Sequence, residues 1–210
     1  GDKIKKIEND KKSSELLIKM ILKGYNKAAK ALIDKNKYDD EYFFQKNEDG
    51  ISPLIATVLS SVFGGNVEFI QQVKSVVDIP ILRKDFIISE YQVWESFQSG
   101  ADAILLIADA IENELLIDLY HLALELGLHV LIETHSSEHL SWIKKLDPEI
   151  VGVNCRNLKT METNLSWFQI VADELPENCL KIAESGIYTQ EDIATIAQFG
   201  YDAALVGTSL

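Results

Sequence analysis

Residues 100–106 read Gly-Ala-Asp-Ala-Ile-Leu-Leu, and residues 200–206 repeat this pattern as Gly-Tyr-Asp-Ala-Ala-Leu-Val. Each segment joins the end of an amphipathic stretch to a short apolar run, as at the junction between a helix and a buried strand. Such a repeat fits a closed (β/α)8 TIM barrel, in which all strands have equivalent surroundings, better than an open sheet, whose edge and central strands differ. The alternative is a favourable helix-to-strand turn that is simply used twice.

Short apolar runs alternate with amphipathic stretches along most of the chain. Continuous apolar runs are typical of parallel strands covered on both faces, with right-handed crossover helices between them. Seven strands are expected, at residues 54–59, 80–83, 103–107, 129–133, 150–154, 180–184 and 203–207. The first fifty residues contain no convincing eighth strand. The fold class predicted is therefore α/β, a (β/α)8 TIM barrel that is either incomplete or has a first strand that is not represented, with a helical segment at the N-terminus.

The helices between these strands have recognisable ends and faces. Residues 114–126 should form a helix that ends at Gly127 in a left-handed cap, with one apolar stripe made by Leu115, Leu119, Leu122 and Leu126. Thr189-Gln-Glu-Asp192 resembles a capping box and begins a helix that Gly200 ends, with its inner face made by Ile193, Ile196 and Ala197. A further helix is expected at residues 67–77. Packing between helices and barrel is expected for Trp94, Trp142 and Trp167.

The composition excludes several classes of protein. The 210 residues include 20 Lys and Arg against 33 Asp and Glu, a net charge of −13, which excludes an electrostatic nucleic-acid or acidic-membrane binder. Apolar runs are much shorter than the roughly 20 residues that cross a bilayer, and no leader opens the chain, so a cytoplasmic protein is expected, as a monomer or homodimer. Cys155 and Cys179 form no disulfide framework or metal pair and are expected to be buried free thiols.

The first fifty residues differ from the rest. Residues 11–35 are amphipathic and helix-forming, and residues 38–50 are acidic and polar. We therefore expect an N-terminal helical extension at 1–50, packed on a barrel domain at 51–210.

Charged and polar residues follow five of the expected strands, at the end where a barrel places its reacting groups. These segments are Arg83-Lys84-Asp85, Glu133-Thr134, Asn154-Cys155-Arg156, Glu184-Ser185-Gly186 and Gly207-Thr208-Ser209. A buried lysine and glutamate there can act as general acid and base, although salt bridges that merely close the barrel are the alternative. The Ser-Gly and Gly-Thr-Ser segments after the last two strands indicate phosphate binding, or else ordinary turns.

The same residues, taken in order, resemble indole-3-glycerol phosphate synthase. The resemblance covers about residues 55–210 and is carried by Pro80-Ile-Leu-Arg-Lys-Asp-Phe, Gly100-Ala-Asp-Ala-Ile-Leu-Leu-Ile, Ile132-Glu-Thr-His, Val151-Gly-Val-Asn-Cys-Arg-Asn-Leu, Ala183-Glu-Ser-Gly-Ile and Val206-Gly-Thr-Ser-Leu. It implies a lyase of tryptophan biosynthesis that closes the indole ring of 1-(2-carboxyphenylamino)-1-deoxyribulose 5-phosphate with loss of CO₂ and water. Neither a cofactor nor a metal is implied, and the partner is a phosphorylated small molecule.

The resemblance also implies roles for individual residues. Lys84 would be the general acid that protonates the substrate ketone, and Glu133 the proton-transfer partner in the dehydration. Asn154 and Glu184 would contact the reacting part of the substrate, with Arg156 near its anthranilate moiety and Phe86 against the aromatic ring. The phosphate would be bound by Ser185, Gly186, Gly207 and Ser209.

Some family features are missing. Residues 1–53 contain no Glu-x-Lys followed by Ser-Pro-Ser, Ser60-Ser61 stands where the family has Thr-Glu, and the family's closing helix would follow Leu210. A degenerate or engineered barrel, a fragment, and a sequence from which residues have been dropped all fit. The alternative function is a catalytically degenerate phosphate-binding barrel, acting as a scaffold or partner subunit. A related isomerase acting on a phosphoribosyl compound is a third hypothesis, against which residues 82–86 argue.

One rival motif lies between two of the site segments. His135-Ser-Ser-Glu-His139 fits the zinc-protease pattern H-x-x-E-H. Zinc chemistry needs both histidines on one helix face, whereas His135 follows a strand end and Ser136 or Ser137 is placed to cap a helix. A solvated strand-to-helix loop is the preferred interpretation.

Overall fold

The computed structural model describes residues 55–58, 66–75, 80–157 and 160–206, with the backbone alone at 55–58. Its seven strands form one parallel sheet in which each strand pairs with the next along the chain. The strands are β1 (Ile55–Val58), β2 (Ile81–Lys84), β3 (Ala103–Ile107), β4 (His129–Thr134), β5 (Ile150–Asn154), β6 (Leu180–Glu184) and β7 (Ala203–Leu205). All seven strands predicted from the apolar runs are confirmed.

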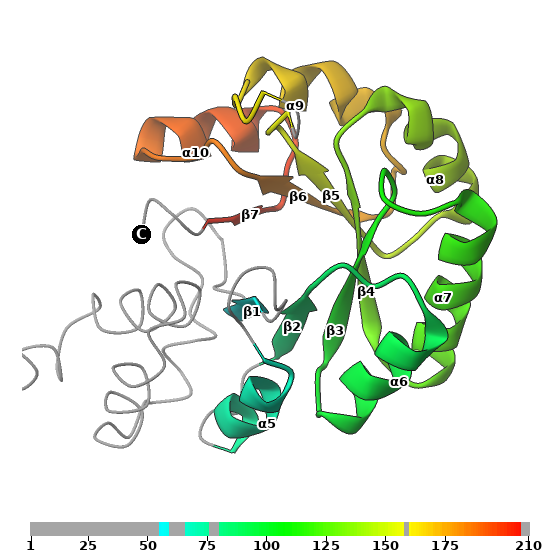
Figure 1. Cartoon of the computed structure of the whole chain (residues 1–210). Coiled ribbons are helices and arrows are strands. Elements are labelled where there is room, and N and C mark those ends of the chain that lie inside the picture. Colours follow the sequence, from blue (N-terminus) through cyan, green and yellow to red (C-terminus); the bar gives the residue numbers. More distant parts are fainter. Residues whose placement is uncertain (1–54, 59–65, 76–79, 158–159, 207–210) are drawn as a thin grey trace, which may run out of the picture.

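The sheet curves, and the helices cover its outer face (Figure 1). They are α5 (Glu68–Lys74), α6 (Glu90–Gln98), α7 (Asn113–Glu125), α8 (Leu140–Leu146), α9 (Ser166–Val171) and α10 (Gln190–Gln198), with short 3₁₀ turns η2 (Ser137–His139) and η3 (Ala172–Glu174). Successive strands joined by helices on one side, in chain order, make a (β/α) barrel wall, which confirms the predicted fold class. The expected N-terminal extension, residues 1–50, lies outside the described residues.

Side chains along a strand alternate between the two faces of the sheet, so an apolar cluster forms on each face. The larger cluster fills the space between strands and helices and includes Ile81, Ile104, Leu119 and Ile132. The smaller cluster lies on the inner face and consists of Leu82, Leu105, Ile107, Leu131 and Ile182. The inner face is therefore packed with side chains near one end, and the charged residues occupy the carboxyl ends of the strands.

The repeated Gly-x-Asp segments have the same geometry in both copies. Gly100 and Gly200 have φ of 82° and 83°, a left-handed conformation that ends the preceding helix at little cost only in glycine. Asp102 then pairs with the start of β2, since its carboxylate accepts from the Ile81 amide at 2.7 Å and its own amide donates to the Ile81 carbonyl. Asp202 makes the same pair with Lys181. The turn is thus used twice, at equivalent places in a barrel wall.

Several helix predictions are confirmed. Gly127 is left-handed, and Thr189 and Asp192 form both bonds of a capping box. Ile196 is buried and Ile193 is half-buried. Trp142 and Trp167 pack against the larger cluster, and both cysteines are buried and free.

Three of the facing predictions are wrong. In the expected stripe of helix α7, Leu119 is buried and Leu122 and Leu126 pack against the larger cluster, but Leu115 is exposed and its neighbour Leu116 is buried instead. Ala197 is exposed beside buried Ile196, and Trp94 is 46% exposed because α6 turns its neighbour Val93 inward. Where two overlapping apolar stripes both have helical spacing, the sequence does not decide which one faces the sheet.

Among the described residues, no helix combines the length and apolarity that crossing a bilayer requires.

Candidate active site

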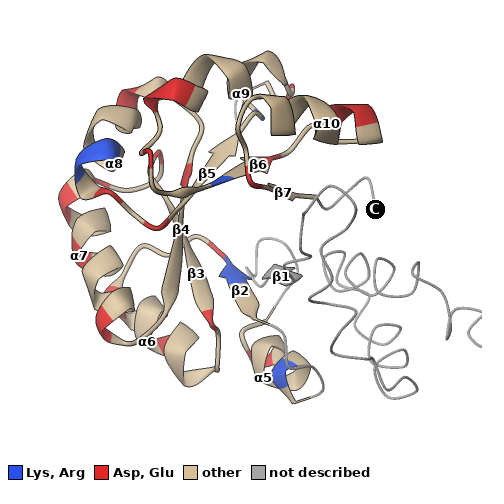
Figure 2. Ribbon diagram, turned by 180° about the vertical axis from the view of Figure 1, so that it is seen from behind, with Lys and Arg blue, Asp and Glu red and all other residues tan. Residues whose placement is uncertain are grey.

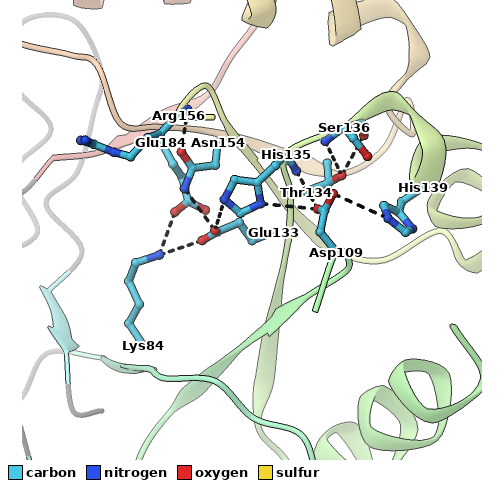
Figure 3. Close-up of polar contacts among 10 residues, drawn as sticks. All are labelled: Lys84, Asp109, Glu133, Thr134, His135, Ser136, His139, Asn154, Arg156 and Glu184. Atoms are coloured by element: carbon cyan, nitrogen blue, oxygen red, sulfur yellow. Dashed lines mark hydrogen bonds and ion pairs between the residues drawn. The ribbon is translucent and has the colours of Figure 1, made fainter. Parts of the chain in front are cut away.

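The centre of the candidate site is the ammonium group of Lys84, which lies between two carboxylates (Figure 3). Lys84 Nζ is 2.7 Å from Glu133 Oε2 and 3.0 Å from Glu184 Oε2. The three residues come from the ends of β2, β4 and β6, alternate strands whose side chains form one layer inside a barrel. Figure 2 shows acidic residues on the outer helices and on several turns, and basic residues on β2, α5 and α8.

Burial and mutual charge set the protonation of this triplet. Burial alone would lower the pKa of Lys84, but the charges of Glu184 and Glu133 outweigh it and hold the pKa above its ordinary value. Burial, with repulsion from Glu133, raises the pKa of Glu184 to about 8. Burial also acts to raise the pKa of Glu133, but the charge of Lys84 and hydrogen bonds lower it. At neutral pH the triplet therefore holds a cationic Lys84, an ionised Glu133 and a protonated Glu184.

Asn154, at the end of β5, orients Glu133. Its Nδ2 donates to Glu133 Oε1 at 3.1 Å, while its own Oδ1 accepts from the Arg156 amide at 3.0 Å. Since the two bonds fix which end of the amide is which, Asn154 always presents a donor to Glu133. The four predicted catalytic residues, Lys84, Glu133, Asn154 and Glu184, are thus in one contiguous network.

Gly152 makes room for Glu184, and the sequence prediction missed this residue. A Cβ placed on Gly152 would lie 2.1 Å from Glu184 Oε1 and 3.1 Å from Leu131 Cδ1. Any side chain there would displace the buried carboxyl group, because two non-bonded atoms cannot approach so closely. A glycine inside an expected strand is a signal of close approach and could have identified it.

The structure describes only some of the predicted substrate- and phosphate-binding residues. Ser185 and Gly186 both have φ of 68°, and a Cβ on Gly186 would meet Cys155 Sγ at 2.8 Å, so the chain makes a tight left-handed turn directly after β6. Phe86 is 42% exposed and lies in the loop after β2. Arg156 is half-buried and lines a cavity of about 610 Å³ together with Tyr188 and with residues 155, 157 and 160–164 after β5. Gly207 and Ser209 lie outside the described residues.

Arg83 does not join the convergent charges, which corrects the sequence-based grouping of Arg83, Lys84 and Asp85. Adjacent strand residues point to opposite faces, so Arg83 is directed toward α6, where its side chain is 4% exposed. It pairs with Asp85 at 3.0 Å and Glu95 at 2.8 Å and donates to Ser96 Oγ. Its charge therefore ties β2 to α6.

Asp109, which the sequence prediction also missed, brings His135 and His139 together. His135 Nδ1 and His139 Nε2 lie 3.4 and 3.6 Å from its two oxygens. Asp109 follows β3 at its carboxyl end, so the strand-end rule that identified the other residues could have found it. His135 precedes η2 and His139 ends it, so the two do not share a continuous helix face. Within the described residues, no group of three or more ligating side chains could hold a metal ion.

Comparison with known proteins identifies the family to which the chain belongs. The family model described as indole-3-glycerol phosphate synthase matches residues 41–210, most of the chain. The chain belongs to the indole-3-glycerol phosphate synthase family. This confirms the resemblance found in the sequence.

Individual members of this family give the degree of similarity. A protein named indole-3-glycerol phosphate synthase from Shouchella clausii is 43% identical over 164 residues, covering 78% of this chain and 64% of the relative. Proteins of the same name from Rhodopirellula baltica and Sulfurisphaera tokodaii are 36% and 35% identical over 92% and 90% of this chain, and 75% and 77% of their own. The chain spans less than two thirds of several relatives, including 64% of the first and 58% of one from Kineococcus radiotolerans.

One solved structure supports the fold alone. The crystal structure of orotidine 5'-phosphate decarboxylase from Pyrococcus horikoshii has a TM-score of 0.56 to this chain at 14% identity, covering 72% of this chain and 76% of that one. At this identity the likeness carries no information on chemistry.

Proposed function

We propose that this chain closes the indole ring of 1-(2-carboxyphenylamino)-1-deoxyribulose 5-phosphate, with loss of CO₂ and water, to give indole-3-glycerol phosphate. The observation that carries the proposal is the ammonium group of Lys84, held between Glu133 and Glu184 at the strand ends. Membership of the indole-3-glycerol phosphate synthase family names the reaction that such a site would perform.

Lys84 is the general acid in this proposal. When the aromatic carbon attacks the substrate ketone, negative charge develops on the ketone oxygen, and a fixed cation stabilises that charge most where water is excluded. An alkoxide is more basic than an amine, so Lys84 can give it a proton although its own pKa is raised. Departure of CO₂ then restores the aromatic ring.

Glu133 exchanges the proton in the dehydration that follows. It is ionised and buried, and its two oxygens are oriented by Lys84 and Asn154. A carboxylate held this way can take the proton that the ring must lose and return it to the departing hydroxyl, which leaves as water. Glu184, protonated at neutral pH, adds no second negative charge beside it and so leaves Lys84 paired mainly with one carboxylate.

The substrate is bound, in this proposal, by the loops after β2, β5, β6 and β7. Ser185, Gly186, Gly207 and Ser209 would hold the phosphate, since barrels commonly bind phosphate after their last two strands. The left-handed turn at Ser185 and Gly186 supports this, because such a turn directs backbone amides outward. Phe86 would contact the aromatic ring, and Arg156, in the cavity after β5, would lie near the substrate carboxylate.

The conditions of action are part of the same proposal. The chemistry above uses side chains alone, so neither a cofactor nor a metal takes part. The buried free thiols of Cys155 and Cys179 fit a reducing cytoplasm, and the protein would act there as a monomer or homodimer.

Product analysis with the purified chain tests the proposal. Incubation with the substrate should release CO₂ and generate indole fluorescence in equal amounts, while the same compound with its ketone reduced to an alcohol should bind without reacting. Binding of both compounds with no CO₂ release would contradict the proposal and indicate a degenerate phosphate-binding barrel. A product of unchanged mass would indicate an isomerase.

A further inference from the structure

A buried histidine contacts the Glu133 oxygen that faces away from Lys84 and that also accepts from Asn154. Glu133 Oε2 faces Lys84, whereas Oε1 lies 3.2 Å from His135 Nε2 (Figure 3). The His135 side chain is only 8% exposed. His135 is therefore the nearest titratable neighbour of Glu133 on the side away from Lys84.

The second ring nitrogen of His135 faces another carboxylate. His135 Nδ1 is 3.4 Å from Asp109 Oδ2, and the same oxygen accepts a hydrogen bond from the His135 amide at 2.8 Å. Burial acts to raise the pKa of Asp109, but hydrogen bonds from His135 and Ser136 outweigh it and lower the pKa. Asp109 is thus a stable anion that fixes the ring from behind.

Both ring nitrogens are at ion-pair distance from an oxygen, yet neither makes a hydrogen bond of good geometry with a described residue. A buried polar atom without a well-formed hydrogen bond is unfavourable, so such atoms are rare and are often functional. Catalytic hydrogen bonds are frequently long before substrate binds. The arrangement resembles a carboxylate–imidazole pair, in which the carboxylate orients the ring and stabilises the imidazolium that forms.

We propose that His135 is a positioning residue that acts through Glu133, exchanging a proton with Glu133 Oε1 while Asp109 holds the ring. This inference rests on the proposed function of Glu133 in the dehydration. A proton that Glu133 has taken from the substrate passes to His135 Nε2: the carboxyl O–H bond breaks, an N–H bond forms, and the products are a carboxylate and an imidazolium. The reverse transfer at the same atom breaks the N–H bond, re-forms the carboxyl O–H bond of Glu133 and leaves a neutral ring.

The charged groups around His135 favour this exchange. Glu133, from the same strand, and Asp109, from the loop after β3, face it directly. Lys84 and Glu184 act on it only through Glu133, and His139 only through Asp109. Two carboxylates flank the ring, so positive charge on it during the exchange lies between opposite charges, and that charge acts to lower the pKa of Glu133.

Kinetics of His135→Gln are the main test. Glutamine keeps an amide donor in reach of Glu133 but cannot carry the proton, so a merely structural role would be preserved. We expect kcat to fall about 10- to 100-fold with KM changed less than about twofold, and the acidic limb of the kcat/KM profile to move to higher pH. In His135→Ala, added imidazole should restore part of kcat. His129→Gln, which changes a 63% exposed histidine at the opposite end of β4, is the control and should resemble the parent protein.

A second measurement does not depend on turnover. The carboxyl carbon of Glu133, followed by ¹³C NMR in the unliganded protein and assigned with Glu133→Gln, should titrate at higher pH in His135→Gln and in Asp109→Asn than in the parent. An unchanged titration together with an unchanged kcat profile would overturn the proposal. If the parent protein released no CO₂, the proposed function would fail, and the Glu133 titration alone would decide whether His135 is coupled to it.

Discussion

Two parts of the barrel wall, β2–α6–β3 and β6–α10–β7, are built alike at positions 100 residues apart. Ile81 is the first residue of β2 and Lys181 the second of β6, helices span Glu90–Gln98 and Gln190–Gln198, and the Gly-x-Asp turns lead to the second strands. Within this common frame one position differs in the sign of its charge: Lys84 ends β2 and Glu184 ends β6. The comparison teaches that the scaffold is repeated while the chemistry depends on single side chains at the strand ends.

The differing pair is also a contact. Lys84 Nζ and Glu184 Oε2 meet at 3.0 Å, and Glu133, from the strand between, completes the triplet. A second lysine at position 184 would repel Lys84, and a glutamate at position 84 would leave three carboxylates without a cation. The asymmetry between the two units therefore places one cation beside the carboxyl groups of Glu133 and Glu184, and it forms the ion pair with Glu133.

Exchanging the two side chains should have the largest effect. Lys84→Glu alone should lower the free energy of unfolding by about 3–5 kcal/mol, because it breaks a buried pair. The double variant Lys84→Glu/Glu184→Lys should recover much of that stability, since an ammonium group again lies beside Glu133. Its turnover should stay at least about 1,000-fold below the parent, because the amine is displaced from its place. Urea unfolding and product formation measure both; a double variant no more stable than Lys84→Glu would contradict the pairing.

The pH dependence of stability should reveal the protonated glutamate. A carboxyl group whose folded pKa is about 8 stabilises the fold fully below its unfolded value and loses that contribution as pH rises through 8. Between pH 5 and 8 this contribution should fall by up to about 1.4 kcal/mol per pH unit. The Glu184→Gln variant lacks this pH-dependent contribution. As pH rises, its free energy of unfolding should therefore increase relative to that of the parent protein. Parallel curves for the two proteins would show that Glu184 is already ionised.

Gly152→Ala tests the space beside Glu184. We expect kcat to fall about 10- to 100-fold, because displacing a catalytic group slightly has effects of that order. Overpacking should also lower the free energy of unfolding by about 1–3 kcal/mol. Shortening the neighbour, in Gly152→Ala/Glu184→Asp, should recover stability relative to Gly152→Ala. If the double variant is the less stable of the two, Glu184 is not what the new methyl group meets.

The helix caps offer the smallest effect and a matched pair. Thr189 Oγ1 accepts from the Asp192 amide at 3.1 Å, whereas the Ser89 side chain caps no backbone amide and donates to Gln92 Oε1 instead. Thr189→Ala should therefore lower the free energy of unfolding by about 1 kcal/mol. Ser89→Ala should lower it by less than half of that. Equal effects in urea unfolding would mean that the two caps are equivalent.

The strands were predictable because parallel barrel strands are apolar on both faces, and the turns because glycine and aspartate are required there by backbone geometry. The four residues Lys84, Glu133, Asn154 and Glu184 could be grouped because strand ends converge in a barrel. Which of these four residues contacts which could not be predicted, because that depends on side-chain rotamers and on distances that the sequence does not give.

The errors have related causes. Arg83 was grouped with the site because a strand end supplies charged residues to both faces, and only the pleat decides that Lys84 faces inward. Gly152 was missed because it contributes no side chain to the site; it matters because it leaves space for the Glu184 side chain. Leu115 and Trp94 were misplaced because the exact rotation of a helix follows from its contacts.

The central claim is that the lysine ending β2 is the acid of the reaction, and replacing it is the most direct test. Lys84→Ala should keep the circular dichroism of the parent while CO₂ release in a single turnover falls at least about 1,000-fold. Lys181→Ala is the control, since Lys181 lies near the start of β6, at the opposite end of the wall, and its ammonium group donates to the Ala172 carbonyl. It should release CO₂ at the parental rate. A folded Lys84→Ala protein with parental CO₂ release would contradict the account.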